Sequence, residues 1–412
     1  MGVLNGLRVL DFSQVWAGPL CASSFGAMGA EVIKIESLKH LDFTRLVRTV
    51  SGDPRHMVIS TLAKDTDIVN SSSVFNSCNM SKLGIRLNLS RSEAIDIARR
   101  LVKMSDVVIE AFRPGVMDRL GLGYPSLKEI KPDIIMTSIS GMGSEGPEKG
   151  YATYASIFSA LGGLAYLTGY RDGRPTEIRA TMDQTVAMTA FFATLAALIH
   201  RQQTGEGQHI DLSARETITC LVGDAVMDYA MNRRVQTRKG NADDIMAPHG
   251  IYPCKGEDTW ISIAIANEGE WEALCDVMGN PDWTRAEKFS DSLSRWHNQE
   301  DLDRLIGGWT VKYTDYEVMD ILQKANIAAV PTFRADELVN DPHLDHRGGW
   351  VNVEHPVLGT LREITFPWRL SVAPPEHHSS PLLGEHEEYV YGTLLGMSAS
   401  EIASLQEREI IY

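Results

Sequence analysis

The stretch GRPTEIRATMDQTVAMTAFFATLAALIHRQQTGEGQHIDLS, residues 173–213, decides how the rest of the chain is arranged. From Val186 to Ile199 its side chains are apolar or small on every face, which predicts a helix that is buried all round and ends near Gly205. Asp183 stands at the beginning of this helix. A carboxylate there lies near the positive end of the helix dipole and beside apolar side chains, so it stays ionised but poorly hydrated, as a nucleophile requires. The alternative is that Asp183 only caps the helix.

Composition indicates a folded enzyme-sized protein and excludes several classes of partner. The 412 residues are 43% hydrophobic and 23% charged, which allows two domains and a large core. The net charge of -15 argues against binding to nucleic acid or to an anionic membrane surface. Five cysteines without a C-x-x-C pair predict neither a disulfide framework nor a metal site. With no signal-peptide pattern and no apolar run of about 18 residues, the chain is expected to be cytoplasmic and not to span a membrane.

Short apolar runs alternate with helical patterns through the first half of the chain. The runs with the character of strands are 7–12, 31–35, 85–89, 106–112, 133–140 and 208–213. Such alternation predicts an α/β fold with a parallel sheet covered on both faces and with ligands beyond the carboxyl ends of the strands. The turn after the first strand lacks G-x-G-x-x-G, so a dinucleotide site is not predicted. Residues 37–79 are polar and without a period, and we expect them to cross the surface or a binding cleft.

The sequence pattern changes near Gly250, and the new pattern continues to about Val330. The run HGIYPCKGEDTWISIAI, residues 249–265, has the pattern of a hairpin, and amphipathic helical patterns follow it. This part is predicted to be a second, smaller α+β domain.

Seven separated runs resemble the class III CoA-transferases, the family of the formyl-CoA:oxalate, L-carnitine and bile-acid CoA-transferases. The runs are LRVLDFSQVWAGPLCASSFGAMGAEVIKIE (7–36), MSKLGIRLNL (80–89), DVVIEAFRPGVMDRLG (106–121), GRPTEIRATMD (173–183), HRQQTGEGQHIDLS (200–213), KGNADDIMAPHGIYP (239–253) and SPLLGEH (380–386). They follow the order of the family over nearly the whole chain.

The resemblance implies a particular domain arrangement. The N- and C-terminal segments would share a Rossmann-like large domain, with residues 1–225 as its first part and 331–412 as the return crossing and its last part. Residues 226–330 would hold a linker and the small domain. Two subunits would thread through one another as interlocked rings, and the assembly would be a homodimer or a heteromer with a homologous subunit.

The resemblance also implies the chemistry of Asp183, which occupies the place of the family's catalytic aspartate after the G-x-P-T run. This carboxylate would form an acyl-aspartyl anhydride and then an aspartyl-CoA thioester. Backbone N–H groups would stabilise the oxyanions, and Gly141, Gly143 or glycines near Gly240 could supply them. A CoA thioester would be the substrate, with no permanently bound cofactor and no metal.

The CoA contacts implied by the resemblance are Trp16, Ala17, Lys82, Phe112, Arg113, Arg119, Ser140 and Gly141. The basic members would meet phosphates, although a solvated surface charge is the alternative for each. The chain departs from the formyl-CoA enzyme at Ser37 and Ser140, where that enzyme has basic residues, and after Gly240, where it has a glycine run. The CoA contacts are therefore expected to be rearranged and oxalate is disfavoured as acceptor.

Aromatic residues suggest the acceptor. Trp16 stands where the formyl-CoA enzyme has glutamine, and Tyr151, Tyr154 and Phe158 follow at helical spacing. A bulky acid such as benzylsuccinate, with succinyl-CoA as donor, would suit these side chains, unless Tyr154 and Phe158 form a core stripe.

Two other functions remain open. One is an α-methylacyl-CoA racemase, although the histidine that such enzymes have after a glycine is replaced here by Tyr151 after Gly150. The other is a non-catalytic CoA-binding subunit of a heteromeric transferase, against which the presence of Asp183 argues.

Overall fold

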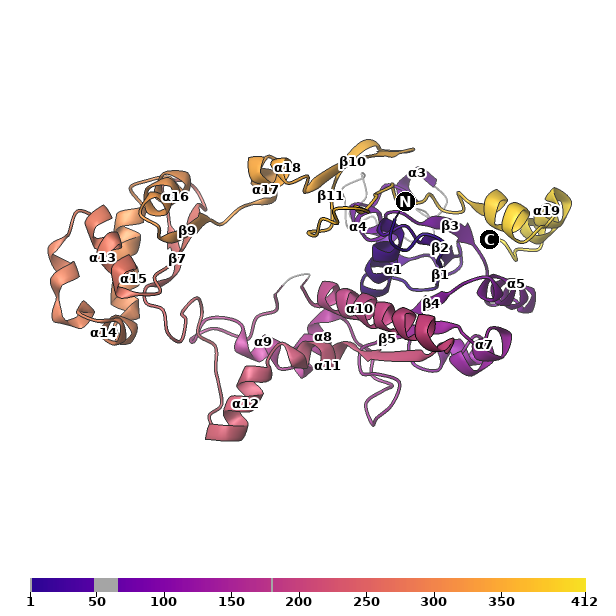
Figure 1. Ribbon diagram of the computed structural model, residues 1–412, viewed down its shortest axis with the longest axis horizontal. Helices are drawn as coiled ribbons and strands as arrows, with labels where there is room; N and C mark the ends of the chain where they lie inside the picture. The colour runs from indigo at the N-terminus through magenta and orange to yellow at the C-terminus, as the bar shows by residue number, and fades with distance from the viewer. Residues whose placement is uncertain (1, 48–65, 179–180) are drawn as a thin grey trace. The chain divides into compact units, whose positions relative to one another are not determined.

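The structure is a computed structural model that describes residues 2–47, 66–178 and 181–412. The chain divides into two compact units, each made of separate segments (Figure 1). The first unit contains 1–165, 177–231 and 344–412, and the second contains 166–176 and 232–343. The sequence predicted domain divisions after residues 225 and 330, and the structure places them after 231 and 343. The prediction also included the short segment 166–176 in the large domain, whereas the structure assigns it to the second unit. Of the polar stretch 37–79, residues 48–65 lie outside the described residues.

A six-stranded parallel sheet forms the centre of the first unit. Its strands are β1 (Arg8–Asp11), β2 (Glu31–Glu36), β3 (Leu83–Arg86), β4 (Val107–Glu110), β5 (Ile135–Ser140) and β6 (His209–Ser213). Every neighbouring pair is parallel, and the order is β3-β2-β1-β4-β5-β6. This is the strand order of the Rossmann fold, so the predicted Rossmann-like sheet is confirmed.

The helices of this unit precede, connect or follow the strands of the sheet. They are α1 (Ala17–Ala27), η1 (Phe43–Leu46), α3 (Thr66–Val69), α4 (Ser73–Cys78), α5 (Ser92–Lys103), α6 (Val116–Arg119), α7 (Tyr124–Ile130), α8 (Ala155–Leu161), α9 (Leu164–Leu167), α10 (Thr181–Thr204), α11 (Ala214–Cys220), α12 (Gly223–Asn232), η5 (Glu388–Leu394) and α19 (Ala399–Glu407). Of these, α9 and α12 extend across the boundary of the unit. A short antiparallel pair, β10 (Trp350–His355) and β11 (Gly359–Ile364), belongs to the same unit.

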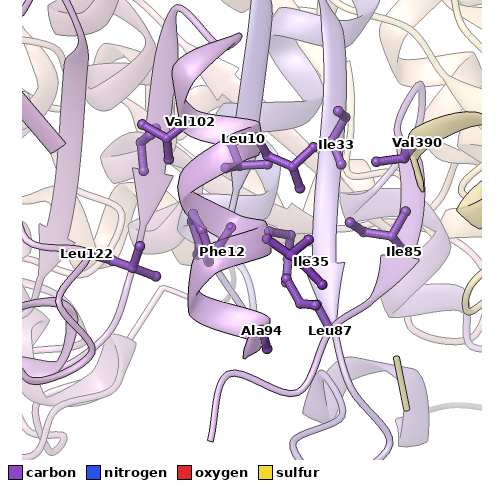
Figure 2. Packing of buried hydrophobic residues seen from close by; sticks show 14 of the residues in the cluster. Leu10, Phe12, Ile33, Ile35, Ile85, Leu87, Ala94, Val102, Leu122 and Val390 are labelled. Atoms are coloured by element: carbon purple, nitrogen blue, oxygen red, sulfur yellow. The ribbon is translucent and has the colours of Figure 1, made fainter. Parts of the chain in front are cut away.

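One face of the sheet is covered by α5, α7, η5 and α19. Figure 2 shows Leu10, Ile33 and Ile85, from three neighbouring strands, gathered with Val102 of α5 and Val390 of η5. All five are buried, and each such side chain contributes about 1.5–3 kcal/mol by leaving water. The C-terminal segment therefore shares its core with the N-terminal strands, as the resemblance implied.

The other face is covered by α1, α8, α10 and α11. The rings of Phe25 in α1 and Phe191 in α10 meet edge to face with centroids 4.7 Å apart. The prediction that α10 is buried all round was wrong, because Phe192 is 74% exposed and Ile199 is 58% exposed. By length and composition alone α10 could cross a membrane, but its inner face is part of this protein core.

The second unit is an α+β domain, as predicted. Its sheet is antiparallel, with the order β7 (His249–Pro253), β8 (Trp260–Ala264) and β9 (Ala328–Pro331). Its helices are α13 (Glu268–Val277), η3 (Asp282–Arg285), η4 (Glu287–Phe289), α14 (Ser292–His297), α15 (Gln299–Thr310), α16 (Asp315–Lys324) and α17 (Ala335–Val339), and α18 (Pro342–His346) crosses its boundary. Its core contains Ile261, Trp271, Phe289 and Leu322.

Candidate active site

The site is built on the carboxyl edge of the parallel sheet, where β1 and β4 lie side by side. The helix after β1 covers one face of the sheet, and α7, which follows β4, covers the other. The chain therefore diverges at this point, and in sheets of this kind ligands bind in the crevice beyond the strand ends at the point of divergence, so we place the candidate crevice here. Gly18 shows how closely the two loops approach. A Cβ added to it would lie 2.3 Å from Cβ of Ser13 and 3.2 Å from Cβ of Ala111.

Helix α10 brings Asp183 to the same edge. Its far end is fixed at the amino edge, where Nη2 of Arg201 lies 2.9 Å from Oδ1 of Asp106, the residue before β4. Asp183 stands eighteen residues earlier, or about 27 Å along the helix axis. Because α10 runs against the strand direction, Asp183 lies toward the carboxyl edge, in the first turn of the helix.

The environment of Asp183 is partly apolar. The side chain is half-buried, and its neighbours Met182 and Val186 are fully buried. Burial raises the pKa of its carboxyl from 3.8 to about 6, and the negative charge of Glu177 adds to the rise. No ion pair or hydrogen bond of this carboxylate occurs among the residues that the structure describes. Asp183 is therefore mostly ionised at neutral pH and weakly solvated, which suits a carboxylate nucleophile.

The predicted contact residues after β1 and β4 lie at this edge. Trp16 precedes α1 as its N-cap and Ala17 begins the helix, and both are half-buried. Phe112 is also half-buried, and its backbone N–H donates to Oε2 of Glu110 at 2.7 Å. Arg113 and Arg119 are exposed, and neither forms an ion pair within the described parts of the chain. Arg113 lies before α6 and Arg119 is the last residue of this helix, and exposed guanidinium groups can donate to phosphate oxygens.

The next strand, β5, ends at Ser140 and is followed by Gly141. The hydroxyl oxygen of Ser140 is buried and has no hydrogen-bond partner among the described residues. Gly141 is required for close packing, because an added Cβ would lie 1.9 Å from Oγ1 of Thr153. Gly143 follows with φ of 85°, a conformation that favours glycine. Gly240 belongs to the second unit.

Lys82, another predicted CoA contact, is bound to protein groups. Its side chain is fully buried, and its ammonium donates to Oδ2 of Asp11 and to Oδ1 of Asn79, each at 2.8 Å. Burial lowers the pKa of this ammonium to about 8, and the charge of Asp11 opposes the change. In the described conformation two of the three N–H donors of this ammonium bind protein groups and the side chain is not exposed, so its contact with a phosphate stays a prediction.

The aromatic residues after β5 are not gathered in a pocket. Tyr151 is exposed, Tyr154 is 74% exposed, and Phe158 is buried in the core beneath α10. Phe158 therefore follows the alternative of a core side chain, and Trp16 is left as the aromatic side chain of the first loop.

Two charged groups beneath the edge were missed in the sequence. They are Glu110, at the end of β4, and Asp42, which follows β2 and is fully buried. The sequence did indicate that charged groups are buried here, because Lys34 lies within the otherwise apolar centre of the β2 run EVIKIE. A charged residue inside a buried strand needs a partner, and that partner was not sought.

The profile of the family described as CoA-transferase family III matches residues 4–387. The chain belongs to this family. A succinyl-CoA–D-citramalate CoA-transferase of Chloroflexus aurantiacus is 30% identical over 410 residues, which cover 99% of this chain and 98% of the relative. The β subunit of a succinyl-CoA–L-malate CoA-transferase of the same organism is 31% identical over 413 residues, covering 99% and 98%. The crystal structure of a CaiB/BaiF family protein from Brucella suis has a TM-score of 0.84 at 30% identity and covers 95% of this transferase and 99% of its own chain.

Proposed function

We propose that this class III CoA-transferase moves CoA from succinyl-CoA to a dicarboxylic acid, with Asp183 as the nucleophile. The observation that carries the proposal is a weakly solvated carboxylate in the first turn of α10, toward the sheet edge where the loops after β1, β4 and β5 end. The donor is inferred from the names of the two relatives.

The proposed reaction alternates between anhydrides and thioesters on Asp183. Its carboxylate attacks the thioester carbonyl, the C–S bond breaks, and CoA leaves as the thiolate. The thiolate then attacks the aspartyl carbonyl of the anhydride, which gives an aspartyl-CoA thioester and releases succinate. The acceptor carboxylate attacks the carbonyl of this thioester, its C–S bond breaks, and CoA leaves again as the thiolate while an anhydride of Asp183 and the acceptor forms. The thiolate then attacks the acceptor carbonyl of this anhydride, which releases the new CoA thioester and restores the carboxylate of Asp183. No water and no redox step are needed.

Each attack produces an oxyanion, which we assign to backbone N–H groups at Gly141 and Gly143. The hydroxyl of Ser140, which is buried and has no partner in the described parts of the chain, supports this assignment because it offers a further donor beside them. For CoA itself, we assign the phosphates to Arg113 and Arg119 and the walls of the site to Trp16, Ala17 and Phe112.

The acceptor is proposed as a dicarboxylic acid because malate and citramalate stand in the names of the relatives. Trp16 supports an aryl-substituted member of this class such as benzylsuccinate. A panel of malate, citramalate, phenyllactate and benzylsuccinate with succinyl-CoA separates the two. A preference for malate that Trp16→Gln leaves unchanged would exclude the aromatic substituent.

A second subunit is proposed to cover the apolar outer side of α10 and α12. Phe192, Val226, Met227 and Met231 are exposed on these helices, and exposed apolar side chains mark a protein contact where they form one patch. The subunit is a second copy or a homologous chain, since one relative is named as a β subunit. A cytoplasmic location is proposed because all five cysteines are free, and four of them are buried while Cys220 is exposed.

The deciding experiment traps the covalent intermediate. Wild-type protein incubated with succinyl-CoA and then hydroxylamine or borohydride should carry the label on Asp183, and Asp183→Ala should lose transfer by roughly a thousandfold or more while its circular dichroism is unchanged. The matched control is Asp224→Ala, which removes an acidic residue from the first turn of α12. Label elsewhere, or an active Asp183→Ala protein, would overturn the mechanism.

The same preparation tests the other two functions. Exchange of the α-hydrogen of an acyl-CoA in deuterated water, without an acceptor acid, would indicate a racemase. Activity that appears only after a homologous chain is added would indicate a non-catalytic subunit.

A further inference from the structure

Four charged side chains lie beneath residues 12–16, which connect β1 to α1 and are called the first loop here. They are Asp11, Lys34, Asp42 and Lys82, and each has a side-chain exposure of 0%. Nζ of Lys82 lies 2.8 Å from Asp11, and Nζ of Lys34 lies 3.1 Å from Asp42. We call these four residues the buried quartet. Two apolar pairs of the same size would be about as stable as two buried ion pairs, so stability alone does not explain them.

The buried quartet is bonded to the backbone of the first loop. The N–H of Ser13 donates to Oδ1 of Asp11 at 2.9 Å, and its hydroxyl also donates to this oxygen. Nζ of Lys34 donates to the carbonyl oxygen of Ser13 at 2.8 Å. The N–H of Val15 donates to Oδ1 of Asp42 at 3.2 Å. Three backbone groups of a short loop are thus held from below by charged side chains.

The loop needs such support because its backbone is strained. Val15 has φ of 75°, in the left-handed region that β-branched residues avoid. A conformation of this kind persists where the surrounding structure fixes it, and it is typical of functional sites. The turn at Val15 places Trp16 at the start of α1, with Gly18 packed against Ser13.

We propose that the buried quartet positions the first loop for CoA binding, and that Lys82 acts through Asp11 rather than on a phosphate. The charged hydrogen bonds hold Val15 in its strained turn, and the turn presents Trp16 and Ala17 at the crevice between β1 and β4. This inference rests on the proposed function, since it takes the first loop as a contact for CoA. Its members are positioning residues because none of them reaches the surface of the crevice.

The test separates positioning from folding and from phosphate binding. Lys82→Met alone leaves Asp11 as an unpaired buried charge and is expected to lower the melting temperature. The double variant Asp11→Leu/Lys82→Met removes both charges and is expected to recover most of that loss. It should still bind CoA about tenfold more weakly, because Ser13 has lost its acceptor. Hydrogen exchange at the amides of Ser13 and Val15 should be faster in the double variant.

The ligand pair CoA and 3′-dephospho-CoA distinguishes the two roles of Lys82. A positioning role weakens binding of both ligands by the same factor and leaves the salt dependence of binding unchanged. A role on the 3′-phosphate would weaken CoA alone and reduce the salt dependence, and that result would overturn the proposal. Wild-type affinity and loop protection in the double variant would overturn it as well.

Two further variants complete the design. The matched control is Asp106→Leu/Arg201→Met, which removes an ion pair at the opposite edge of the sheet and should leave CoA binding unchanged. If the double variant at the first loop does not fold, Ser13→Ala removes one hydroxyl and keeps both ion pairs, and it should weaken both ligands about threefold. Asp183→Ala is expected to bind CoA as the wild type does and to keep slow hydrogen exchange at the amides of the first loop. The test of Asp183 as nucleophile and the test of the buried quartet as positioning residues can therefore fail independently.

Discussion

The loops after β1 and β4 border the same crevice but are held in different ways. The first loop is bonded to two buried ion pairs, whose four charges have no contact with solvent. The loop after β4, residues 111–115, is held at its start by Glu110, which accepts the N–H of Phe112 at 2.7 Å. Burial raises the pKa of the Glu110 carboxyl to about 7, against hydrogen bonds from Ser138 and Phe112, and the charges of Asp118 and Asp211 add to the rise.

The difference lies in the pH at which each support changes its charge. The ammonium of Lys82 has a pKa of about 8, so it is still charged and paired with Asp11 at neutral pH. Glu110 is protonated below about pH 7 and ionised above it, and only the ionised form makes a strong charged bond to Phe112. Four predictions test this comparison, in order of decreasing effect.

The largest effect is expected from Asp42→Leu, which leaves Lys34 buried without its partner. The free energy of unfolding of the first unit should fall by about 3–5 kcal/mol in urea at pH 7. Glu110→Gln, measured at pH 5 where the native carboxyl is already protonated, should change it by about 1 kcal/mol or less. Equal losses in the two variants would mean that both loops are held in the same way.

The second prediction concerns the pH dependence of stability. The pKa of Glu110 is higher in the folded protein, about 7, than its ordinary value of 4.5, so the folded state binds the proton more tightly. The stability that this proton contributes is present below pH 4.5 and is lost as pH rises to 7, by up to about 3 kcal/mol. The urea concentration at the unfolding midpoint, measured at pH 5, 6, 7 and 8, should fall in the wild type and not in Glu110→Gln. The prediction would be contradicted if the midpoints of the two proteins changed with pH in the same way.

The third prediction concerns Asp183, the proposed nucleophile, which lies in neither loop. The pKa of Asp183 is about 6, so kcat/KM for succinyl-CoA should fall about tenfold for each pH unit below that value. Glu177→Gln should move the midpoint to lower pH, because the charge of Glu177 helps to raise this pKa. A midpoint that stays fixed in that variant would show that burial alone sets the value.

The smallest effect is expected at the exposed end of the loop after β4. Arg113→Gln and Arg119→Gln should each weaken CoA binding severalfold and reduce its dependence on salt, with kcat nearly unchanged at saturation. The first-loop variants should keep the full salt dependence. If the arginine variants also keep it, the phosphates are bound elsewhere.

The sheet was predictable because each of its strands is a short apolar run between helical patterns, and that signal is local. The place of Asp183 also followed from sequence, since it begins a long apolar helix after a family motif. The burial of Lys82 was not predictable, because it depends on Asp11, seventy-one positions away. The exposed side of α10 was missed for a similar reason. An apolar helix face has the same sequence pattern whether it packs against this chain or against another protein.

Helix α10 is fixed both at its C-terminal end and along its length. Arg201 fixes one end to Asp106 and Asp133, and the core holds its length against α1, so Asp183 at the other end has little freedom to move. As the proposed nucleophile on a helix fixed in this way, Asp183 cannot shift to fit substrates of different size. Each acyl group must therefore bring its carbonyl carbon to the same point in space, and the choice between donor and acceptor acids passes to the loops that seat the remainder of the molecule.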